Sequence, residues 1–451
     1  MSFLSLHFAA AFGLLLLLLH RFPERTTQQR LLLAASYLFY GLWDWRFLAL
    51  LFVLSWAVWW LGRKIGEQHS KAALVAGLVL CTGTLGIFKY LGFFVDSFCV
   101  LAGLEPVSLR LILPVGLSCY IFQAISYLCD VYLGKIVPVN LEKVLLYIGF
   151  FPQIVSGPIV KARDFLPQLE RAHPITGANL SYGLQLFSVG LFKKVVIADR
   201  LGICVDAVFS APAAYSGLSL VMAVFAFTIQ LYCDFSGYSD MAVGVARCMG
   251  YDLGRNFNMP FLARNPSEFW NRWHISLSSW FREYVYIPLG GSRRGQVKTC
   301  RNLMVTMLLS GIWHGANWTF AVWGAMHGVA SVVQRLWKRK LPTAVSRLAM
   351  FQLFSLSLIP FRAENMAQAW LIFLRIVTLA EGVRYISVFS VIYGGLILGL
   401  HLLANRISHG DSLFRPLNTS SFGAKVVICL FLLITFLFAC TGDTAFLYAQ
   451  F

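Results

Sequence analysis

The chain has 451 residues, of which 58% are hydrophobic and only 13% are charged. A soluble domain of this size could not bury so much apolar surface, so the composition excludes an ordinary water-soluble globular protein. The net charge of +17 would suit a nucleic-acid-binding protein, but no basic stretch is interleaved with aromatic residues in a soluble context, so we expect no nucleic-acid partner.

Apolar residues come in long runs, and several runs reach the roughly 20 residues that a helix needs to cross a bilayer. The alternating ten-residue segments of a β-barrel are not visible. The sequence therefore predicts an all-α, polytopic membrane protein with about 11–13 membrane helices, because the three longest runs can each hold a pair of short helices. The expected spans are 3–20, 30–45, 47–61, 72–94, 107–131, 141–157, 180–197, 217–250, 301–337, 346–380, 385–404 and 422–440.

The first apolar run, FGLLLLLLHRFPER (12–25), has no basic segment before it and no small-residue cleavage site. It is therefore interpreted as a first anchor followed by a basic turn, rather than as a cleavable signal peptide. Short cytoplasmic loops are rich in Lys and Arg, so we expect the basic segments to face the cytoplasm. These segments are 21–30, 63–71, 161–171, 293–301 and 335–340.

No linker is long enough to separate soluble domains, so we expect a single integral-membrane domain over residues 1–451. The ten cysteines contain no CxxC pair, and nearly all lie in apolar runs. A thiol in such a run behaves as a small hydrophobic group. The pattern therefore predicts neither a disulfide framework nor a metal site.

The segment FFPQIVSGPIVKARDFLPQL (150–169) joins an apolar run to a basic loop through Pro152, Gly157 and Pro158. Irregular backbone at membrane depth is tolerated only where it is buried in protein or lines a cavity. This segment is therefore typical of a funnel wall or a re-entrant turn.

The segment LYCDFSGYSDMAVGVARCMG (231–250) places Asp234 and Asp240 inside an apolar stretch. Such carboxylates must pair or line a wet cavity. Asp234 and Tyr238 share a helix face, so one hypothesis is an acid that positions a substrate or an imidazole. The alternative, which we favour, is a buried tie between Asp234 and a basic residue such as Arg247.

The segment NPSEFWNRWHISLSSWFREYVYIPLGG (265–291) begins with a helix signal, because Asn265 suits the N-cap and Glu268 completes a capping box. We expect one helix that ends near Pro288. Its apolar stripe includes Trp273 and its polar stripe is Asn271, Ser278 and Arg282, which favours a helix lying at the membrane interface. His274 lies between the two stripes, and it is either an ordinary interfacial histidine or a functional one.

The segment GIWHGANWTF (311–320) places His314 in the middle of an apolar helix. Gly311 and Gly315 are spaced so that a neighbouring helix can approach closely beside this imidazole. An ionisable side chain within a membrane segment indicates a functional site by default, and the alternative is a structural histidine hydrogen-bonded between helices. On a continuous helix His327 would point about 140° away from His314, so we expect it to lie outside that site.

Taken in order, these segments make the chain resemble the membrane-bound O-acyltransferase (MBOAT) family. The likeness is to its bacterial branch, which includes the membrane subunit of alginate O-acetylation and the D-alanyl transfer protein of teichoic acid. It covers about Pro114 to Trp370, which we expect to be the motif-bearing core. The matching segments are 150–169, 231–291, RNLMVTMLLSGIWHGANWTFAVWGAMHG (301–328) and PFRAENMAQAW (360–370).

The resemblance implies a ring of tilted helices, with re-entrant or interfacial helices, around a central tunnel. His314 falls on the catalytic histidine of the family's W-H-G motif, and His274 falls on a second histidine motif. His314 would act as the general base, and His274 would orient the donor or steady developing negative charge. We expect the substrates to contact six residues near these histidines: Trp313, Trp318, Asn271, Trp273, Asp234 and Tyr238.

The resemblance also implies the setting. The expected location is the bacterial inner (cytoplasmic) membrane, which the chain crosses several times. No cofactor is expected to stay bound, because acetyl-CoA or an acyl-carrier thioester serves as a donor substrate. The acceptor would be an extracytoplasmic polysaccharide such as alginate, cellulose, another exopolysaccharide or peptidoglycan. A periplasmic, esterase-like O-acetyltransferase is the expected protein partner. The alternatives left open are D-alanyl transfer to teichoic acid and a transporter or flippase without chemistry.

Overall fold

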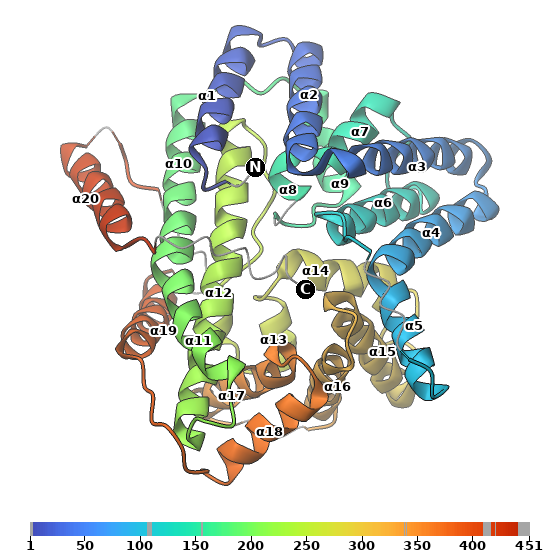
Figure 1. Ribbon diagram of the computed structural model, residues 1–451. Helices are drawn as coiled ribbons and strands as arrows, with labels where there is room; N and C mark the ends of the chain where they lie inside the picture. The colour runs from blue at the N-terminus through green and yellow to red at the C-terminus, as the bar shows by residue number, and fades with distance from the viewer. Residues whose placement is uncertain are drawn as a thin grey trace. The chain divides into compact units, whose positions relative to one another are not determined.

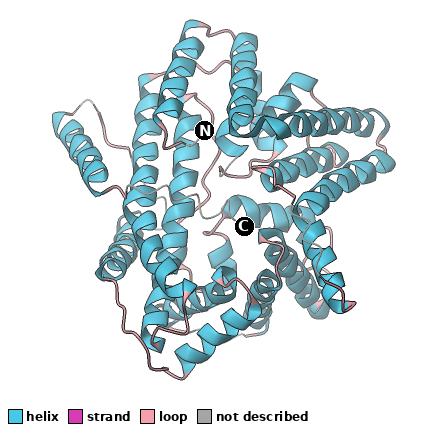
Figure 2. Cartoon of the chain, in the orientation of Figure 1, coloured by secondary structure: helices cyan, strands magenta, loops and turns pink. Residues whose placement is uncertain are grey.

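A computed structural model describes residues 3–105, 111–154, 157–337, 339, 341–408, 416–419 and 421–440. The described chain consists of helices and their connections (Figures 1 and 2), with one isolated β-bridge between Tyr215 and Val383. The predicted all-α class is therefore confirmed.

The chain forms two compact units, and the first comprises residues 1–187 and 239–254. Several of its helices begin at side-chain caps, as where the Ser70 hydroxyl and the Asn140 side-chain oxygen accept backbone N–H groups one turn later. Whether the two units form the single membrane domain predicted over 1–451 stays a prediction. The helices of this unit are α1 (Leu6–Arg21), α2 (Arg25–Asp44), α3 (Leu48–Gln68), α4 (Lys71–Leu85), α5 (Leu91–Leu101), α6 (Leu117–Tyr132), α7 (Leu141–Gly149), α8 (Phe151–Ile154), α9 (Ala162–Phe165) and most of α10 (Gly177–Phe192).

Two predicted spans of this unit are shorter than expected. The span predicted at 107–131 contains helix only from Leu117, because Pro114 and Gly116, with φ 72°, precede α6; residues 107–110 lie outside the described part. The span predicted at 141–157 contains the nine-residue α7, which ends where Phe150 leaves the helical region. The irregular backbone predicted for 150–169 is thus present: its regular pieces among the residues described there are the short helices α8 and α9 and a 3₁₀ turn that begins at Leu166.

The second unit comprises residues 188–238 and 255–451. One large cluster of buried apolar side chains forms its core, including Phe227, Phe269, Phe354 and Ile372. Its helices are α11 (Asp199–Ser210), α12 (Gly217–Cys248, shared with the first unit), α13 (Pro266–Trp270), α14 (Ile275–Phe281), α15 (Gln296–His314), α16 (Trp318–Leu336), α17 (Thr343–Arg362), α18 (Met366–Val377), α19 (Val388–Ser408) and α20 (Phe422–Phe438).

The three longest apolar runs fold in two ways. Runs 301–337 and 346–380 each form two helices, as predicted, but run 217–250 forms the single 32-residue helix α12. Among the described residues, four helical segments are long and apolar enough to cross a membrane. They are 25–68, 71–101, 217–248 and 343–362, and four apolar helices are shorter. These helices are those of a multi-pass membrane protein, and the exact number of crossings stays a prediction.

Helices α15 and α16 form a tightly packed hairpin (Figure 1). A Cβ atom on Gly311 would lie 2.8 Å from the Cα of Gly324, so the two backbones touch at these glycines. Near the turn, a Cβ on Gly315 would overlap the ring of Phe320. The close approach predicted from Gly311 and Gly315 is therefore confirmed, and the neighbouring helix is the next one in the chain.

We predict that Gly311→Ala lowers the stability of the protein by about 1–3 kcal/mol, because the added methyl group must push two backbones apart. The thermal midpoint in detergent measures this loss. Gly83→Ala is the matched control, since a Cβ at Gly83 in α4 meets no atom within 4 Å. An unchanged midpoint for Gly311→Ala would show that the hairpin can widen at no cost.

Candidate active site

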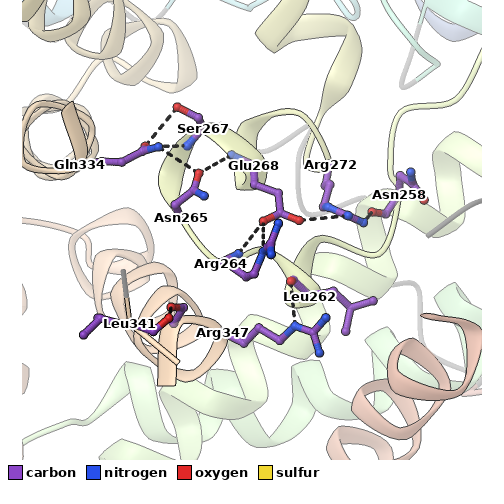
Figure 3. A network of polar contacts seen from close by, with 11 residues as sticks. Asn258, Leu262, Arg264, Asn265, Ser267, Glu268, Arg272, Gln334, Leu341 and Arg347 are labelled. Carbon is purple, nitrogen blue, oxygen red and sulfur yellow. Dashed lines mark hydrogen bonds and ion pairs between the residues drawn. The ribbon is translucent and has the colours of Figure 1, made fainter. Parts of the chain in front are cut away.

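The segment that begins at Asn265 starts as its sequence predicts. The Asn265 side-chain oxygen accepts the backbone N–H of Glu268 at 2.9 Å, and Pro266 is the first residue of α13. The Glu268 carboxylate accepts the backbone N–H of Arg264, one residue before the position that a capping box requires. Figure 3 shows this network, in which Gln334 of α16 donates to the same Asn265 oxygen. The polar contacts thus tie α13 to the end of α16.

Glu268 lies between two arginine side chains, with oxygen–nitrogen distances of 3.1 Å to both Arg264 and Arg272. Partial burial favours the neutral acid, but the hydrogen bonds from Arg264 and the charge of Arg272 outweigh it and lower the pKa of Glu268. The carboxylate is therefore ionised at neutral pH. It holds the chain on either side of α13 in place.

The single helix predicted over this segment is wrong, because the chain breaks between α13 and α14. His274 adopts φ 45°, and α14 begins at Ile275. Asn256 holds the break: its carbonyl accepts the backbone N–H of Ile275 at 2.9 Å, and its side-chain oxygen accepts the hydroxyl of Ser276 at 2.9 Å. These bonds replace helical ones. The break sets His274 among buried rings, with Phe235 at 4.7 Å and Trp313 at 6.2 Å between centroids.

His314 is the last residue of α15, not the middle of a longer helix. Gly315 is extended, and the Asn317 side chain caps α16 by accepting the backbone N–H of Thr319. The imidazole is 7% exposed and lies against three rings. The centroid distances are 4.9 Å to Trp313, 4.9 Å to Trp323 and 5.3 Å to Phe361. Because Trp313 also contacts His274, the two predicted catalytic histidines belong to one aromatic cluster.

His327 belongs to the same cluster, against expectation. The prediction assumed a continuous helix, but the turn between α15 and α16 folds the chain back. The centroid of the His327 ring lies 4.7 Å from that of Trp323, which also contacts His314. Its Nε2 is 2.9 Å from the hydroxyl of Ser357 in α17. Sequence periodicity could not reveal this placement, because periodicity holds only within one helix.

A cavity of about 530 Å³ lies beside this cluster, within the second unit. Five polar residues of its lining are exposed and form what we call the rim: Ser267, Asn271, Arg282, Ser292 and Arg335. On α15 the lining passes from Thr299 through Thr306 to Ser310, one helical turn before His314. Thr299, Thr306 and Ser310 are all buried, so the α15 side of the cavity is a buried polar wall that ends one turn before His314. Of the lining rings, Trp270 contacts Trp323 and His327.

The remaining predicted substrate contacts fall in different places. Asn271 lines the cavity, as do Ser278 and Arg282 of the same polar stripe. Trp273 is in the apolar core, 4.7 Å from the ring of Phe354. Trp318 is 61% exposed on the first turn of α16. Trp323 of α16 and Phe361 of α17 contact the His314 ring. The roles of all these residues in binding stay predictions.

Asp234 forms the buried ion pair that its apolar surroundings predict, but its partner is Lys194 and not Arg247. The Lys194 Nζ lies 2.6 Å from Asp234 and 2.7 Å from Asp199, and all three side chains are at most 5% exposed. Tyr238 adds its ring face at 5.5 Å from the ammonium. The Arg247 guanidinium nitrogen lies 3.7 Å from a carboxylate oxygen of Asp252. The sequence signal for this ion pair is that Lys194 lies within an apolar run, where a lysine side chain needs a buried anionic partner.

Comparisons of the sequence with known proteins identify its relatives. The sequence fits the model of MBOAT, the membrane-bound O-acyltransferase family, over residues 131–352. It is 41% identical to a probable alginate O-acetylase of Azotobacter vinelandii over 355 residues, which is 75% of this chain and 70% of that protein.

Two further relatives have other names. The chain is 36% identical to a peptidoglycan O-acetyltransferase of Helicobacter pylori, over 75% of this chain and 71% of the relative. It is 28% identical to a teichoic acid D-alanyltransferase of Streptococcus thermophilus, over 66% of this chain and 72% of the relative. The acetyl-transferring relatives are thus the more similar ones among these three.

We predict that Lys194→Met destabilises the protein by about 3–5 kcal/mol, because it leaves two buried carboxylates without their cation. Asp234→Asn should cost less and keep measurable activity, since Asp199 still pairs with Lys194. Melting curves and turnover in detergent measure both effects. A folded but inactive Asp234→Asn protein would contradict the structural role and move Asp234 into the reaction.

Proposed function

This chain belongs to the membrane-bound O-acyltransferase family, and we propose that it passes an acetyl group from a cytoplasmic thioester to an extracytoplasmic polysaccharide. Membrane O-acetyltransferase activity follows from its acetyl-transferring relatives. The observation that carries the proposed donor route is the cavity, whose lining passes from an exposed rim to the buried turn before His314.

The rim suits an anionic thioester donor. Arg282 and Arg335 supply positive charge, and Asn271 supplies an amide. Arg335 lies in the last turn of α16 and Ser292 precedes α15, so this end of the hairpin carries the basic segments that face the cytoplasm under the positive-inside rule. Acetyl-CoA, or the phosphopantetheine arm of an acyl carrier, would place its phosphates at the rim and its thioester at depth. Polar residues along α15, such as Thr306 and Ser310, would contact the arm.

His314 is the proposed general base. It takes the proton from the acceptor hydroxyl as that oxygen attacks the thioester carbonyl carbon, and the C–S bond then breaks. The imidazolium returns the proton to the leaving sulfur, so donor and acceptor exchange an acyl group for a proton. Trp313, Trp323 and Phe361 exclude water from this imidazole. His274, whose ring also contacts Trp313, would steady the charge that develops.

The acceptor class is proposed from the named substrates of the relatives, which are alginate and peptidoglycan. A polysaccharide outside the cytoplasmic membrane of a bacterium would receive the acetyl group, with a periplasmic esterase-like transferase as partner. Purified protein should then acetylate polymer poorly until a periplasmic extract is added. Efficient polymer acetylation by the purified chain alone would remove the need for a partner.

D-alanyl transfer is the second candidate, favoured only by the relative at 28% identity. Assays with acetyl-CoA and with a D-alanyl carrier thioester separate the two donors. Transport without acyl transfer is disfavoured as a function, because these relatives are named as acyl-transferring enzymes.

We predict that His314→Ala lowers acetyl-CoA turnover by about 10² to 10⁴, the usual loss when a general base is removed. His274→Ala should be less severe. Release of free CoA thiol in detergent, with an acceptor oligosaccharide, measures turnover. His401→Ala is the control, because His401 is also buried but contacts Tyr232 and Phe261 instead. Near-normal turnover by folded His314→Ala protein would defeat the assignment.

A second prediction concerns the rim. Replacing Arg282 and Arg335 together with Gln should raise the KM for acetyl-CoA about tenfold with little change in kcat, because the lost charges bind the donor equally in ground and transition states. Replacing Arg293 and Arg294 with Gln is the control, since neither lines the cavity. If only the control double variant raised KM, the donor would enter along the loop and not through this cavity.

A further inference from the structure

Two indole N–H groups in the aromatic cluster of His314 are buried without a hydrogen-bond acceptor among the residues that the structure describes. They belong to Trp270 and Trp323, whose rings are 5.8 Å apart at 87°. Trp270 lines the cavity, and the ring of Trp323 meets that of His314 nearly at a right angle, 83°, with centroids 4.9 Å apart. The two rings therefore connect the lining of the cavity to the proposed base.

His327 fixes these two indoles in place and is not itself a candidate base. The Ser357 hydroxyl donates its one hydrogen to the carbonyl of Phe354 at 2.7 Å. The His327 Nε2 at 2.9 Å must therefore be the donor to Ser357, which leaves Nδ1 as an acceptor in the neutral ring. The imidazole contacts both indoles, with centroids 5.0 Å from Trp270 and 4.7 Å from Trp323. It is a positioning residue.

Buried N–H groups in native proteins are nearly always hydrogen-bonded, so an acceptor from outside the described chain is expected at these indoles. An indole N–H only donates, which restricts the partner to an oxygen or another acceptor atom. A thioester that reaches His314 through the cavity carries such an atom, its carbonyl oxygen. That oxygen gains negative charge when the acceptor hydroxyl attacks, and N–H donors aimed at it are the usual means of stabilising such charge.

We propose that the indole N–H of Trp323, assisted by that of Trp270, forms the oxyanion hole of this acyltransferase. This inference rests on the proposed function. The hydroxyl oxygen forms the new C–O bond, the C–S bond breaks, and the proton passes through His314 to the sulfur. The two indoles keep their protons throughout and hold the carbonyl oxygen by hydrogen bonds. Trp323 and Trp270 thereby become catalytic residues.

The test replaces Trp323 with benzothienylalanine, which keeps the bicyclic ring but has sulfur in place of the N–H. We expect kcat with acetyl-CoA to fall about 10²-fold, as when one oxyanion donor is removed, while the KM for acetyl-CoA stays within about twofold. Trp370→Phe is the control: it also removes an indole N–H, but from a side chain of α18 that is 59% exposed. Its kcat should not change.

A binding measurement separates oxyanion recognition from packing. The methylphosphonyl analogue of acetyl-CoA carries a charged oxygen where the oxyanion would form, whereas S-ethyl-CoA carries none. The wild-type protein should bind the methylphosphonyl analogue more tightly, and the benzothienylalanine variant should lose that preference. Unchanged kcat and unchanged preference in the variant would overturn the inference, and a lower melting temperature with a higher KM would do so in favour of a packing role. If His314→Ala also turned over normally, the proposed function itself would have failed.

Discussion

The contact between the backbones of Gly311 and Gly324 sets the geometry on which the rest of the site depends. Because no side chain separates α15 from α16 at this point, the turn that follows is short and brings Trp323 against His314. The same hairpin supplies one wall of the cavity, from Thr299 to Ser310. Any side chain at the glycines would move the imidazole and its enclosing ring at once.

Local signals in the sequence predicted the parts of the fold that local chemistry decides. Asn265 caps α13 because its side chain needs only a backbone N–H three residues away. The close helix approach at Gly311 follows from the absence of a side chain. Asp234 had to find a cation, because an isolated carboxylate in an apolar segment is costly. In each case the residue type alone predicts the kind of contact that the structure contains.

Partners distant in the sequence could not be predicted in the same way. Lys194 lies 40 residues from Asp234, and Arg247 was simply the cation nearest in the sequence. The break at His274 depends on hydrogen bonds to Asn256, which take over from helical bonds that the local pattern favours. His327 reaches the cluster only because the chain reverses at Gly315. The spacing of apolar residues describes one helix at a time, so it cannot predict where a tertiary contact ends a helix.

The length of α12 fixes where its buried ion cluster lies in the bilayer. At 1.5 Å per residue, its 32 residues make a rod about 48 Å long, whereas the hydrocarbon core is about 30 Å thick. Tilts of membrane helices reach only about 40°, so even a strongly tilted α12 extends past the hydrocarbon. Asp234 is the eighteenth residue of the helix, close to its midpoint. A hydrocarbon core about 30 Å thick therefore includes Asp234 wherever it falls along the rod, so a helix that crosses the bilayer keeps this carboxylate and its lysine within the hydrocarbon.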